Sequence, residues 1–377
     1  MNQELKNLAA TINQPHLLAR LRELVEIESP SHDKAAVDRA ADKVSLWAAE
    51  QGARIKRHKQ KQFGDVLELR FGPRSGPRSL LLGHLDTVWP IGTLAKMPWR
   101  EQDGKLFGPG VLDMKSGVIM ALEAIAALKS LGANSAVTLL LVSEEEIGSP
   151  ISRPITEAVA KESAAVFVLE PAQGLAYKTA RKGVGHFQLH VQGIAAHAGV
   201  DFDRGHSAIL EMSRLIQQVS AFTGSRPGLT VNVGFVQGGT QSNVIAAECR
   251  AEVDVRIAKA SDAAHIERLF RRLKVTDKAC RLTLTGGINR PPMERKSGTI
   301  NLFRQAQKLA AELGFTLDEA STGGGSDGNF TAALGVPTLD GMGSVGSGAH
   351  AAHEHIVTSH LIERTALLAG MIARTGA

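Results

Sequence analysis

The sequence predicts an α/β protein with a mostly parallel sheet and a smaller α+β domain inserted into it. Up to residue 169, short apolar runs typical of buried strands alternate with amphipathic helical patterns, which favours parallel strands joined by helices. Between residues 180 and 290 the strands alternate apolar and polar residues, as strands with one exposed face do. Helical patterns return after residue 290, so we expect the second domain to interrupt the first.

Hydrophobic periodicity indicates the individual elements. Apolar residues at helical spacing predict helices over residues 15–29, 34–51, 118–131, 206–222, 262–273, 297–313 and 359–374. Apolar or alternating runs predict strands over residues 67–71, 80–84, 137–142, 165–169, 185–191 and 248–257. The expected domains are therefore an α/β part over 1–179 and 291–377, and an inserted part over 180–290.

Composition excludes several classes of protein. With 377 residues, of which 43% are hydrophobic, the chain is long enough for two packed domains. Its apolar runs are too short to span a bilayer, and Met1–Lys6 does not begin a secretory signal. We therefore expect a cytoplasmic protein without a membrane partner. Cys249 and Cys280 lack the spacing of a metal site and are expected to be packing residues.

The formal net charge of +5 raises the question of nucleic-acid binding. Lysine and arginine are interspersed with acidic residues, and the sequence has one tyrosine and no basic–aromatic motif. We therefore expect no nucleic-acid partner. A mild positive field suits a small anionic substrate equally well.

The run Leu80–Val88 is the first candidate for a functional site. It ends a predicted strand with His84 and Asp86, whose side chains share one face because they are two residues apart. Open α/β sheets bind ligands at the carboxyl ends of strands. A carboxylate that accepts one ring N–H of a histidine leaves the other nitrogen for a metal. A capping aspartate beside a surface histidine explains the pair equally well.

Further carboxylates follow predicted strands or loops. Asp113 follows a glycine-rich loop and precedes a predicted helix, so it is either a helix N-terminal residue or a bridge between two metal ions. Glu144–Glu146 follow a buried strand, where like charges this close repel unless cations neutralise them. A solvated acidic turn is the alternative. Glu170 ends another apolar strand, directly before Pro171.

The C-terminal segment adds His350, His353 and His355 after a glycine-rich loop. Only one of them is needed as a ligand, and the group also fits a surface cluster. Carboxylate oxygens mixed with imidazole nitrogens suit zinc, cobalt or manganese rather than soft thiolate chemistry. The order and context of these segments together predict a metal centre.

These motifs resemble those of the di-zinc metallopeptidases and deacylases, which include glutamate carboxypeptidases, acetylornithine deacetylase and succinyl-diaminopimelate desuccinylase. The resemblance runs from about residue 15 to the C-terminus, is closest to bacterial glutamate carboxypeptidases, and lies in GHLDT (83–87), GPGVLDMKSG (108–117), EEEIGS (144–149) and LEP (169–171). It implies a zinc-peptidase catalytic domain and an inserted ferredoxin-like lid, often used for dimerisation.

The resemblance also implies a role for each residue of the centre. It implies two divalent metal ions per subunit, with zinc as first choice and cobalt or manganese as alternatives. The implied metal ligands are His84, Asp113 (bridging), Glu146, Glu170 and His350, the last chosen because Glu354 follows it by four residues. Glu145 is implied as general base and Asp86 as the residue that supports His84. A cis peptide bond between Asp113 and Met114 is implied as well.

The implied substrate contacts lie mostly in the inserted domain. In dimeric relatives, a histidine matching His197 reaches the partner's active site and polarises the scissile carbonyl, so we expect a homodimer. Asn243 and Arg256 match further contacts, and the guanidinium of Arg256 suits a substrate carboxylate. Arg290 is a second candidate for that role, and Lys178 is a candidate for a glutamate side chain. For these last two residues an exposed, solvated charge is the alternative.

The function predicted from these residues is metal-dependent hydrolysis of an amide bond. The expected product is a C-terminal amino acid, with glutamate as first choice, released from a small peptide or N-acyl substrate. The closest alternative is an N-acyl amino acid deacylase similar to acetylornithine deacetylase. A non-catalytic metal-dependent binding protein is the alternative from another class.

Overall fold

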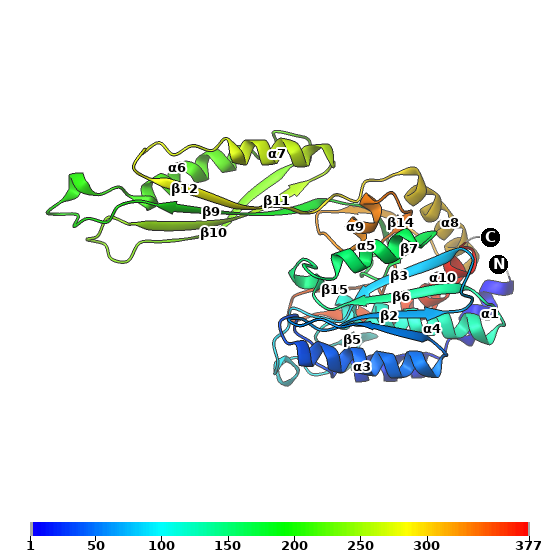
Figure 1. Ribbon diagram of the computed structural model, residues 1–377. Helices are drawn as coiled ribbons and strands as arrows, with labels where there is room; N and C mark the ends of the chain where they lie inside the picture. Colours follow the sequence, from blue (N-terminus) through cyan, green and yellow to red (C-terminus); the bar gives the residue numbers. More distant parts are fainter. Residues whose placement is uncertain (1–2, 376–377) are drawn as a thin grey trace. The chain divides into compact units, whose positions relative to one another are not determined.

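The computed structural model describes residues 3–375 (Figure 1). The chain forms two compact units. The first contains the chain up to Ala180, Arg295–Ser321, and the chain from Ser326 onward. The second contains Arg181–Glu294 and a short return of the chain, Thr322–Gly325.

A six-stranded mixed sheet forms the centre of the first unit (Figure 1). In spatial order its strands are β1 (Arg54–His58), β2 (Val66–Phe71), β6 (Ala136–Val142), β3 (Arg78–His84), β7 (Ala165–Val168) and β14 (Thr338–Leu339). The neighbours β6, β3, β7 and β14 run parallel, whereas β1–β2 and β2–β6 pair antiparallel. The predicted α/β fold with a mostly parallel sheet is confirmed.

Helices cover both faces of this sheet, which explains why its strands are continuous apolar runs. Those whose apolar side chains pack on one face are α1 (Gln3–Thr11), α2 (Gln14–Val25), α3 (Lys34–Glu50), α4 (Ser116–Ser130), α8 (Ser297–Leu313) and α10 (Leu361–Ala373). On the other face, α5 (Arg153–Lys161) covers alternate side chains of β3, β6 and β7. The short helix α9 (Gly328–Ala333) packs beside α5. Among residues 3–375, no helix combines the length and apolarity that crossing a membrane requires.

Helix α4 is apolar on all sides because it packs against strand β3 and helices α2 and α10. Its first residue follows Asp113 by three positions, so a rigid, buried helix anchors that carboxylate. Gly117 is required in its first turn, since a Cβ there would lie 2.2 Å from the carbonyl oxygen of Leu169. This close approach brings the start of α4 against the segment that leads to Glu170.

Two smaller sheets complete the first unit. One contains β15 (Gly346–Ser347), β16 (His355–Val357), β5 (Lys105–Phe107) and β4 (Arg100–Gln102), and in the other β13 (Glu319–Thr322) pairs with β8 (Tyr177–Arg181). The antiparallel pair β15–β16 encloses the loop that carries His350. Pairing of β16 with β5 ties that loop to a segment about 250 residues earlier in the chain.

The second unit is a four-stranded antiparallel sheet with two helices on one face (Figure 1). Its strands are, in spatial order, β10 (Thr230–Gly238), β11 (Glu248–Ile257), β9 (Gly183–Gln192) and β12 (Arg281–Arg290), and its helices are α6 (Ala208–Ser220) and α7 (Ser261–Arg271). Odd-numbered residues of β9 and β11, such as Phe187 and Val253, are buried in a core shared with the helices. The prediction of strands with one exposed face is therefore confirmed.

Sequence periodicity does not reveal the two outer strands of this sheet, β10 and β12. β10 is exposed along most of its length, and β12 is buried only at its last residue, so neither forms an apolar run. Gly286 and Gly287 weaken the strand pattern of β12 further. Helices α1 and α5 also escape detection, because each has nine residues and helical periodicity is weak over so short a stretch.

A buried carboxylate, Asp65, holds the turn before β2. Its Oδ1 accepts hydrogen bonds from Nζ of Lys34 at 2.7 Å and from the backbone N–H of Gln60 at 2.9 Å. Arg57 and Lys59 place cationic nitrogens 3.0 and 2.9 Å from its Oδ2. Burial by itself would raise the pKa of Asp65, but these hydrogen bonds and charges outweigh burial and hold the pKa well below its ordinary value.

We expect Asp65→Asn to lower the free energy of unfolding by about 1–3 kcal/mol at pH 7, because the cations around it lose their carboxylate. Since the folded-state pKa lies below the unfolded-state value of about 3.9, this stabilisation is present above about pH 4 and is lost as the pH falls further. Chemical denaturation at pH 7 and pH 3 measures the effect. Asp42→Asn, at an exposed partner of Arg57, is the control and should change stability by less than about 1 kcal/mol. Equal losses for the two variants would contradict the role of Asp65.

Candidate metal centre

His84 is the last residue of β3, with 1% of its surface exposed. Its Nδ1 donates to the backbone carbonyl of Asp86 at 2.9 Å and lies 3.5 Å from the carboxylate of the same residue. The backbone oxygen, rather than the carboxylate expected from the sequence, therefore makes the shorter contact. With the proton on Nδ1, Nε2 is the nitrogen that faces the neighbouring carboxylates.

The carboxylate of Asp86 positions the acidic turn that follows β6. It accepts hydrogen bonds from the backbone N–H groups of Glu145 at 3.1 Å and Glu146 at 3.2 Å, and from the hydroxyl of Ser31 at 2.7 Å. Backbone N–H groups at the start of a helical turn have no partner within the turn. Asp86 therefore satisfies these groups and ties the segment of His84 to both glutamates.

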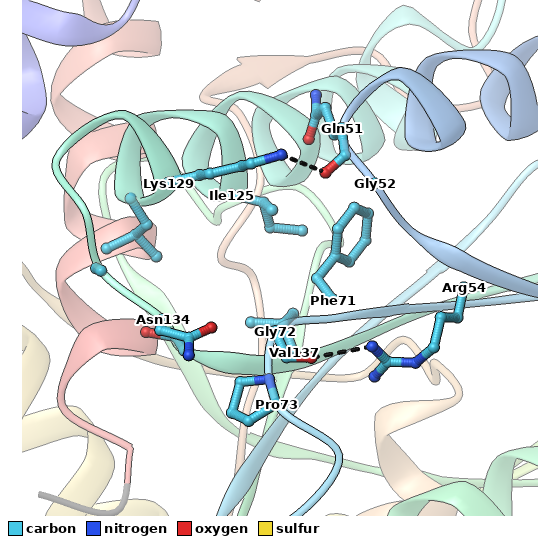
Figure 2. A pocket seen from close by; sticks show the side chains of 13 residues that line it. Gln51, Gly52, Arg54, Phe71, Gly72, Pro73, Ile125, Lys129, Asn134 and Val137 are labelled. Atoms are coloured by element: carbon cyan, nitrogen blue, oxygen red, sulfur yellow. Dashed lines mark hydrogen bonds between the residues drawn. The ribbon is translucent and has the colours of Figure 1, made fainter.

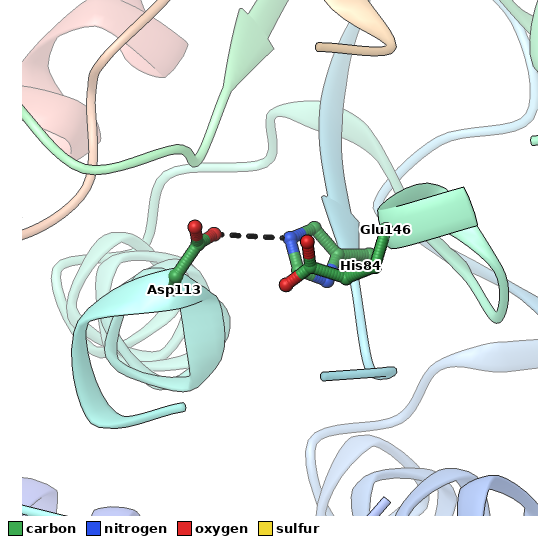
Figure 3. Close-up of side chains that lie close together, drawn as sticks. All are labelled: His84, Asp113 and Glu146. Atoms are coloured by element: carbon green, nitrogen blue, oxygen red, sulfur yellow. Dashed lines mark hydrogen bonds and ion pairs between the residues drawn. The ribbon is translucent and has the colours of Figure 1, made fainter. Parts of the chain in front are cut away.

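Asp113 stands between two histidines. Its Oδ1 lies 3.2 Å from Nε2 of His84, and its Oδ2 lies 3.4 Å from Nε2 of His350. Figure 3 shows the Asp113 carboxylate directed towards His84, with Glu146 beside the imidazole. The two oxygens thus face different imidazoles, as a bridging ligand requires. The peptide bond between Asp113 and Met114 is cis, as expected.

Two glutamates complete the cluster. Oε2 of Glu146 lies 3.0 Å from Nε2 of His350, and Oε1 of Glu170 lies 3.8 Å from Nε2 of His84. Ligand atoms lie within 4.8 Å of one another in two triplets, His84–Asp113–Glu146 and His84–Glu145–Glu170. The structure therefore brings together all five predicted metal ligands and places the predicted general base beside them.

His350 comes from a loop with an unusual backbone. Its φ of +62° lies in the left-handed region, and Gly348 before it has a φ of +85°. A non-glycine residue held there is strained, and such strain occurs frequently at functional sites. Of the three histidines in this motif, His350 is the one whose imidazole lies within 3.4 Å of Asp113 and Glu146, whereas His353 and His355 form no ion pair with either carboxylate. The loop geometry thus supports the choice of His350.

Charge balance in the cluster requires cations. Burial disfavours the charged form of His84, but its contacts with Asp113 and Asp86 outweigh burial and raise its pKa well above the ordinary value. Hydrogen bonds to Asp113 and Glu146 raise the pKa of His350 to about 10. Burial raises the pKa of Glu146, which is the response of a carboxyl group that lacks sufficient positive charge nearby. In the metal-free chain, protons on the imidazoles supply part of the charge that a metal would supply.

The donor set fits divalent metal ions. Oε1 of Glu146 is buried and has no hydrogen-bond partner within residues 3–375, although nearly all buried polar atoms have one. Imidazole nitrogens with carboxylate oxygens are typical ligands of zinc and manganese. A metal ion among these groups would satisfy the unpartnered oxygen and displace the imidazole protons.

Glu354 has a larger role than its place in the sequence reveals. It is fully buried, and its Oε1 accepts the backbone N–H groups of Leu112 at 2.9 Å and Asp113 at 3.1 Å. Its Oε2 accepts the N–H of Gly110 at 2.9 Å and the indole N–H of Trp89 at 2.8 Å. One carboxylate therefore fixes the backbone that carries Asp113, the predicted bridging ligand. The only sequence signal is its position four residues after a ligand histidine.

Two other buried charges hold the same region. Glu144 turns away from the cluster, and its Oε1 accepts the backbone N–H groups of Ile151 at 3.1 Å and Ser152 at 2.5 Å. The acidic run is therefore not a solvated turn. Lys115 donates to the carbonyl of Ile27 at 2.7 Å, and burial lowers the pKa of Lys115 to about 7.

The second unit brings His197 and Asn243 together. The N–H of Ala198 donates to the carbonyl of Asn243 at 2.9 Å, and a β-bridge joins His197 to Val244. Nδ1 of His197 accepts the N–H of Gly199 at 3.1 Å, so the neutral ring carries its proton on Nε2. Because the ring is exposed, that N–H is available to a carbonyl oxygen.

Three arginines of the second unit surround the glycine loop 323–325. Arg256 and Arg181 donate hydrogen bonds to its carbonyl oxygens over 3.1–3.2 Å. Arg290 packs against it, since a Cβ at residue 325 would lie 3.1 Å from Cδ of Arg290. Asp254 binds the guanidinium of Arg256 through two hydrogen bonds of 2.8 Å. The predicted carboxylate anchor is therefore paired with a carboxylate of its own strand, which the sequence did not indicate.

The two remaining candidates, Lys178 and Arg290, are both buried, at 8% and 7% exposed. Neither is the exposed, solvated charge that the sequence left open as an alternative. Lys178 lies on β8 in the first unit, and its backbone pairs with Asp340. The predicted metal ligands and Lys178 thus belong to the first unit, and His197 and the other three substrate-binding candidates to the second.

Comparison with known sequences gives a consistent family. Residues 80–374 match peptidase family M20/M25/M40. The chain is 30% identical to carboxypeptidase G2 of Pseudomonas sp. (strain RS-16), over 98% of this chain and 91% of that protein. It is 27% identical to acetylornithine deacetylase of Myxococcus xanthus, over 69% of this chain and 72% of the relative.

Solved structures show the same fold. A metallo-carboxypeptidase of family M20 from Sulfolobus solfataricus, Sso-CP2, superposes with a TM-score of 0.77 at 16% identity, covering 95% of this chain and 98% of its own. Aminopeptidase PepT from Bacillus cereus ATCC 10987 gives a TM-score of 0.79 at 20% identity, covering 97% and 100%. The resemblance seen in the motifs is confirmed: the chain belongs to peptidase family M20/M25/M40 and is a metal-dependent hydrolase.

Proposed function

We propose that this protein is a two-metal carboxypeptidase that releases a C-terminal amino acid, preferably glutamate, from a small peptide or N-acyl substrate. One observation carries the proposal: the two carboxylate oxygens of Asp113 face different histidines, one facing His84 and the other His350. The 30% identity to carboxypeptidase G2 over nearly the whole chain supports the carboxypeptidase assignment.

The proposed centre would hold two divalent ions, with Asp113 available to both. His84 and Glu170 would complete one site, and Glu146 and His350 the other. Zinc is our first choice, with cobalt or manganese as alternatives. A divalent ion in such a site polarises a carbonyl group and lowers the pKa of water from 15.7 towards about 7.

Glu145 is the proposed general base. It lies beside His84 and Glu170, and Asp86 fixes its backbone. A carboxylate held in this way accepts a proton from the attacking water and passes it to the leaving amine. Because Glu146 and Glu170 serve as ligands in this proposal, Glu145 remains available for proton transfer.

Arginines of the second unit are the proposed anchors for the α-carboxylate of the substrate. Arg256, Arg290 and Asn243 would bind it, and Lys178 would bind a glutamate side chain. Three guanidinium groups surround loop 323–325, and Asp254 supplies one negative charge beside them. A substrate carboxylate suits these side chains, because guanidinium binds carboxylate through two parallel hydrogen bonds.

We further propose a homodimer formed through the second unit. In it, Nε2 of His197 would donate to the scissile carbonyl in the partner's active site. Seven large apolar side chains of this unit are 46–76% exposed: Ile194, Val200, Phe202, Ile209, Leu210, Phe235 and Val236. Apolar residues exposed in such number favour association with another surface.

The second candidate function is deacylation of N-acyl amino acids. The 27% identity to acetylornithine deacetylase favours it, and it uses the same chemistry on a different acyl group. A hydrolysis screen over N-acyl-glutamates, dipeptides and N-acetyl amino acids, with zinc, cobalt and manganese in turn, separates the two. Preference for C-terminal glutamate with varied acyl groups supports the carboxypeptidase. Equal activity on C-terminal amides would contradict anchoring through the α-carboxylate.

Glu145→Gln should lower kcat by about 10²–10⁴-fold, because the amide cannot accept a proton. Metal content, measured by atomic emission, should stay at the wild-type value. Glu146→Gln is the matched control one residue away and should lose metal instead. If the Glu145 variant loses metal and the Glu146 variant keeps it, the assignment of base and ligand is displaced by one position.

Glu354→Gln should weaken metal binding by about 10–100-fold, as changes beside metal ligands typically do. The new NH₂ group would face backbone N–H groups that need an acceptor. Competition with a chelator measures the affinity, and Trp89→Phe, which removes one of the four donors, should have a smaller effect. Wild-type metal affinity in Glu354→Gln would contradict its positioning role.

His197→Ala and Glu145→Gln should each be inactive, yet refolding them together should restore about a quarter of wild-type activity. Half of the dimers are then mixed, and each has one intact site. Refolding each variant with wild-type protein controls for refolding losses. If mixed dimers form and stay inactive, His197 acts within its own chain.

A further inference from the structure

The first unit has a cavity at the opposite end of its central sheet from the candidate metal centre. It has a volume of about 370 Å³ and lies where α3, β2 and α4 end and where the chain enters β6. Arg78, the first residue of β3, donates hydrogen bonds to carbonyl oxygens of three residues that line it, Phe71, Pro73 and Val137. His84 is the last residue of the same seven-residue strand, so roughly 20 Å separates the two places.

The floor of this cavity is apolar. Its residues include Phe71, Ile125, Leu128 and Val137, each at most 6% exposed. Figure 2 shows Phe71 and Ile125 between the cationic ends of the surrounding side chains. A volume in this range with an apolar floor is typical of a small-molecule site.

Cations form its rim. Nζ of Lys129 donates to the backbone carbonyl of Gln51, and Nη1 of Arg54 donates to that of Gly72, each at 3.0 Å (Figure 2). Within residues 3–375 these are the only hydrogen bonds of the two cations, so most of their donors remain for a ligand. No acidic side chain lines the cavity.

Arg78 adds a buried positive charge below the apolar floor. Arg78 is 6% exposed and forms no salt bridge with any described residue. Burial and repulsion from Arg70 and Arg54 lower its pKa, and they outweigh the attraction of Glu162 and Glu68, which lie further away than contact distance. A buried cation without a carboxylate at contact distance leaves a positive potential around it. Since its hydrogen bonds satisfy carbonyls of the floor, those oxygens are less able to repel an anion.

We propose that this cavity binds a small organic carboxylate with an apolar body, independently of the metal centre. The carboxylate would take the donors of Arg54 and Lys129, for which guanidinium offers a bidentate pair. The apolar body would lie on Phe71, Ile125 and Leu128. A bare inorganic anion would leave this floor exposed to water, so the apolar lining selects an organic ligand.

Calorimetric titration of chelator-treated, metal-free protein with 3-phenylpropanoate tests the proposal, because the metal centre is then unable to bind the carboxylate through a metal. We expect a Kd of about 1 mM or tighter for a ligand of this size. The neutral isostere 3-phenylpropanamide should bind at least tenfold more weakly. Inorganic phosphate should also bind at least tenfold more weakly.

Arg54→Gln/Lys129→Gln should weaken binding of 3-phenylpropanoate at least tenfold. The matched control is Arg226→Gln/Lys278→Gln, which removes the same charge from exposed positions of the second unit and should bind as wild type does. Asn134→Trp, at an exposed residue of the rim, should block the cavity and abolish binding. Circular dichroism confirms that each variant is folded.

Three results would overturn the proposal. They are absence of binding at 10-fold above the expected Kd, equal binding of the acid and its amide, and undiminished binding by the folded Arg54/Lys129 variant. Equal affinity for inorganic phosphate would show that the cavity binds anions in general. It would contradict the argument that the apolar floor favours an organic carboxylate. None of these results bears on metal-dependent hydrolysis, which is measured separately.

Discussion

Mutual repulsion among carboxylates at one edge of the central sheet is the constraint on which the first unit depends. Asp113, Glu145, Glu146 and Glu170 converge on His84, with ligand atoms within 4.8 Å in each triplet. Such a group is stable only with positive charge inside it. Protons on the imidazoles supply part of that charge in the metal-free chain, which explains their raised pKa values. The fold must therefore hold these side chains in place against their own repulsion.

A second set of buried carboxylates holds the candidate ligands in place by binding backbone N–H groups. Asp86, Glu144 and Glu354 each accept at least two backbone N–H groups. Each also lies within four residues of a candidate ligand or base in the sequence, so each fixes a ligand segment to another part of the chain. Hydrogen bonds between N–H groups and a carboxylate are among the stronger ones in proteins. Anchoring through them leaves the ligand side chains free to face a metal.

The two units divide the chemistry between them. The first carries the candidate metal ligands, and the second carries the exposed His197 and the arginines around loop 323–325. That loop belongs by its contacts to the second unit, although the chain on both sides of it belongs to the first. Arg181 and Arg256 explain this, because both donate to its carbonyl oxygens. Because Arg256 is paired with Asp254, a substrate carboxylate that bound Arg256, as we propose, would have to compete with a carboxylate already present.

The sequence by itself determined the α/β class, the strands that end at the ligands, and the identity of the clustered residues. Burial imposes a local periodicity on strands and helices, and polar residues at the carboxyl ends of parallel strands meet at one edge. The choice of Asp113, Glu146 and His350 within their segments came from the resemblance of the motifs to a known family. Only the tertiary structure decided that the oxygens of Asp113 face different histidines, and that Glu354 binds a backbone segment about 240 residues earlier. The exposed outer strands β10 and β12 also emerged only there. Contacts between distant segments depend on how whole elements pack, and local sequence patterns carry no record of that packing.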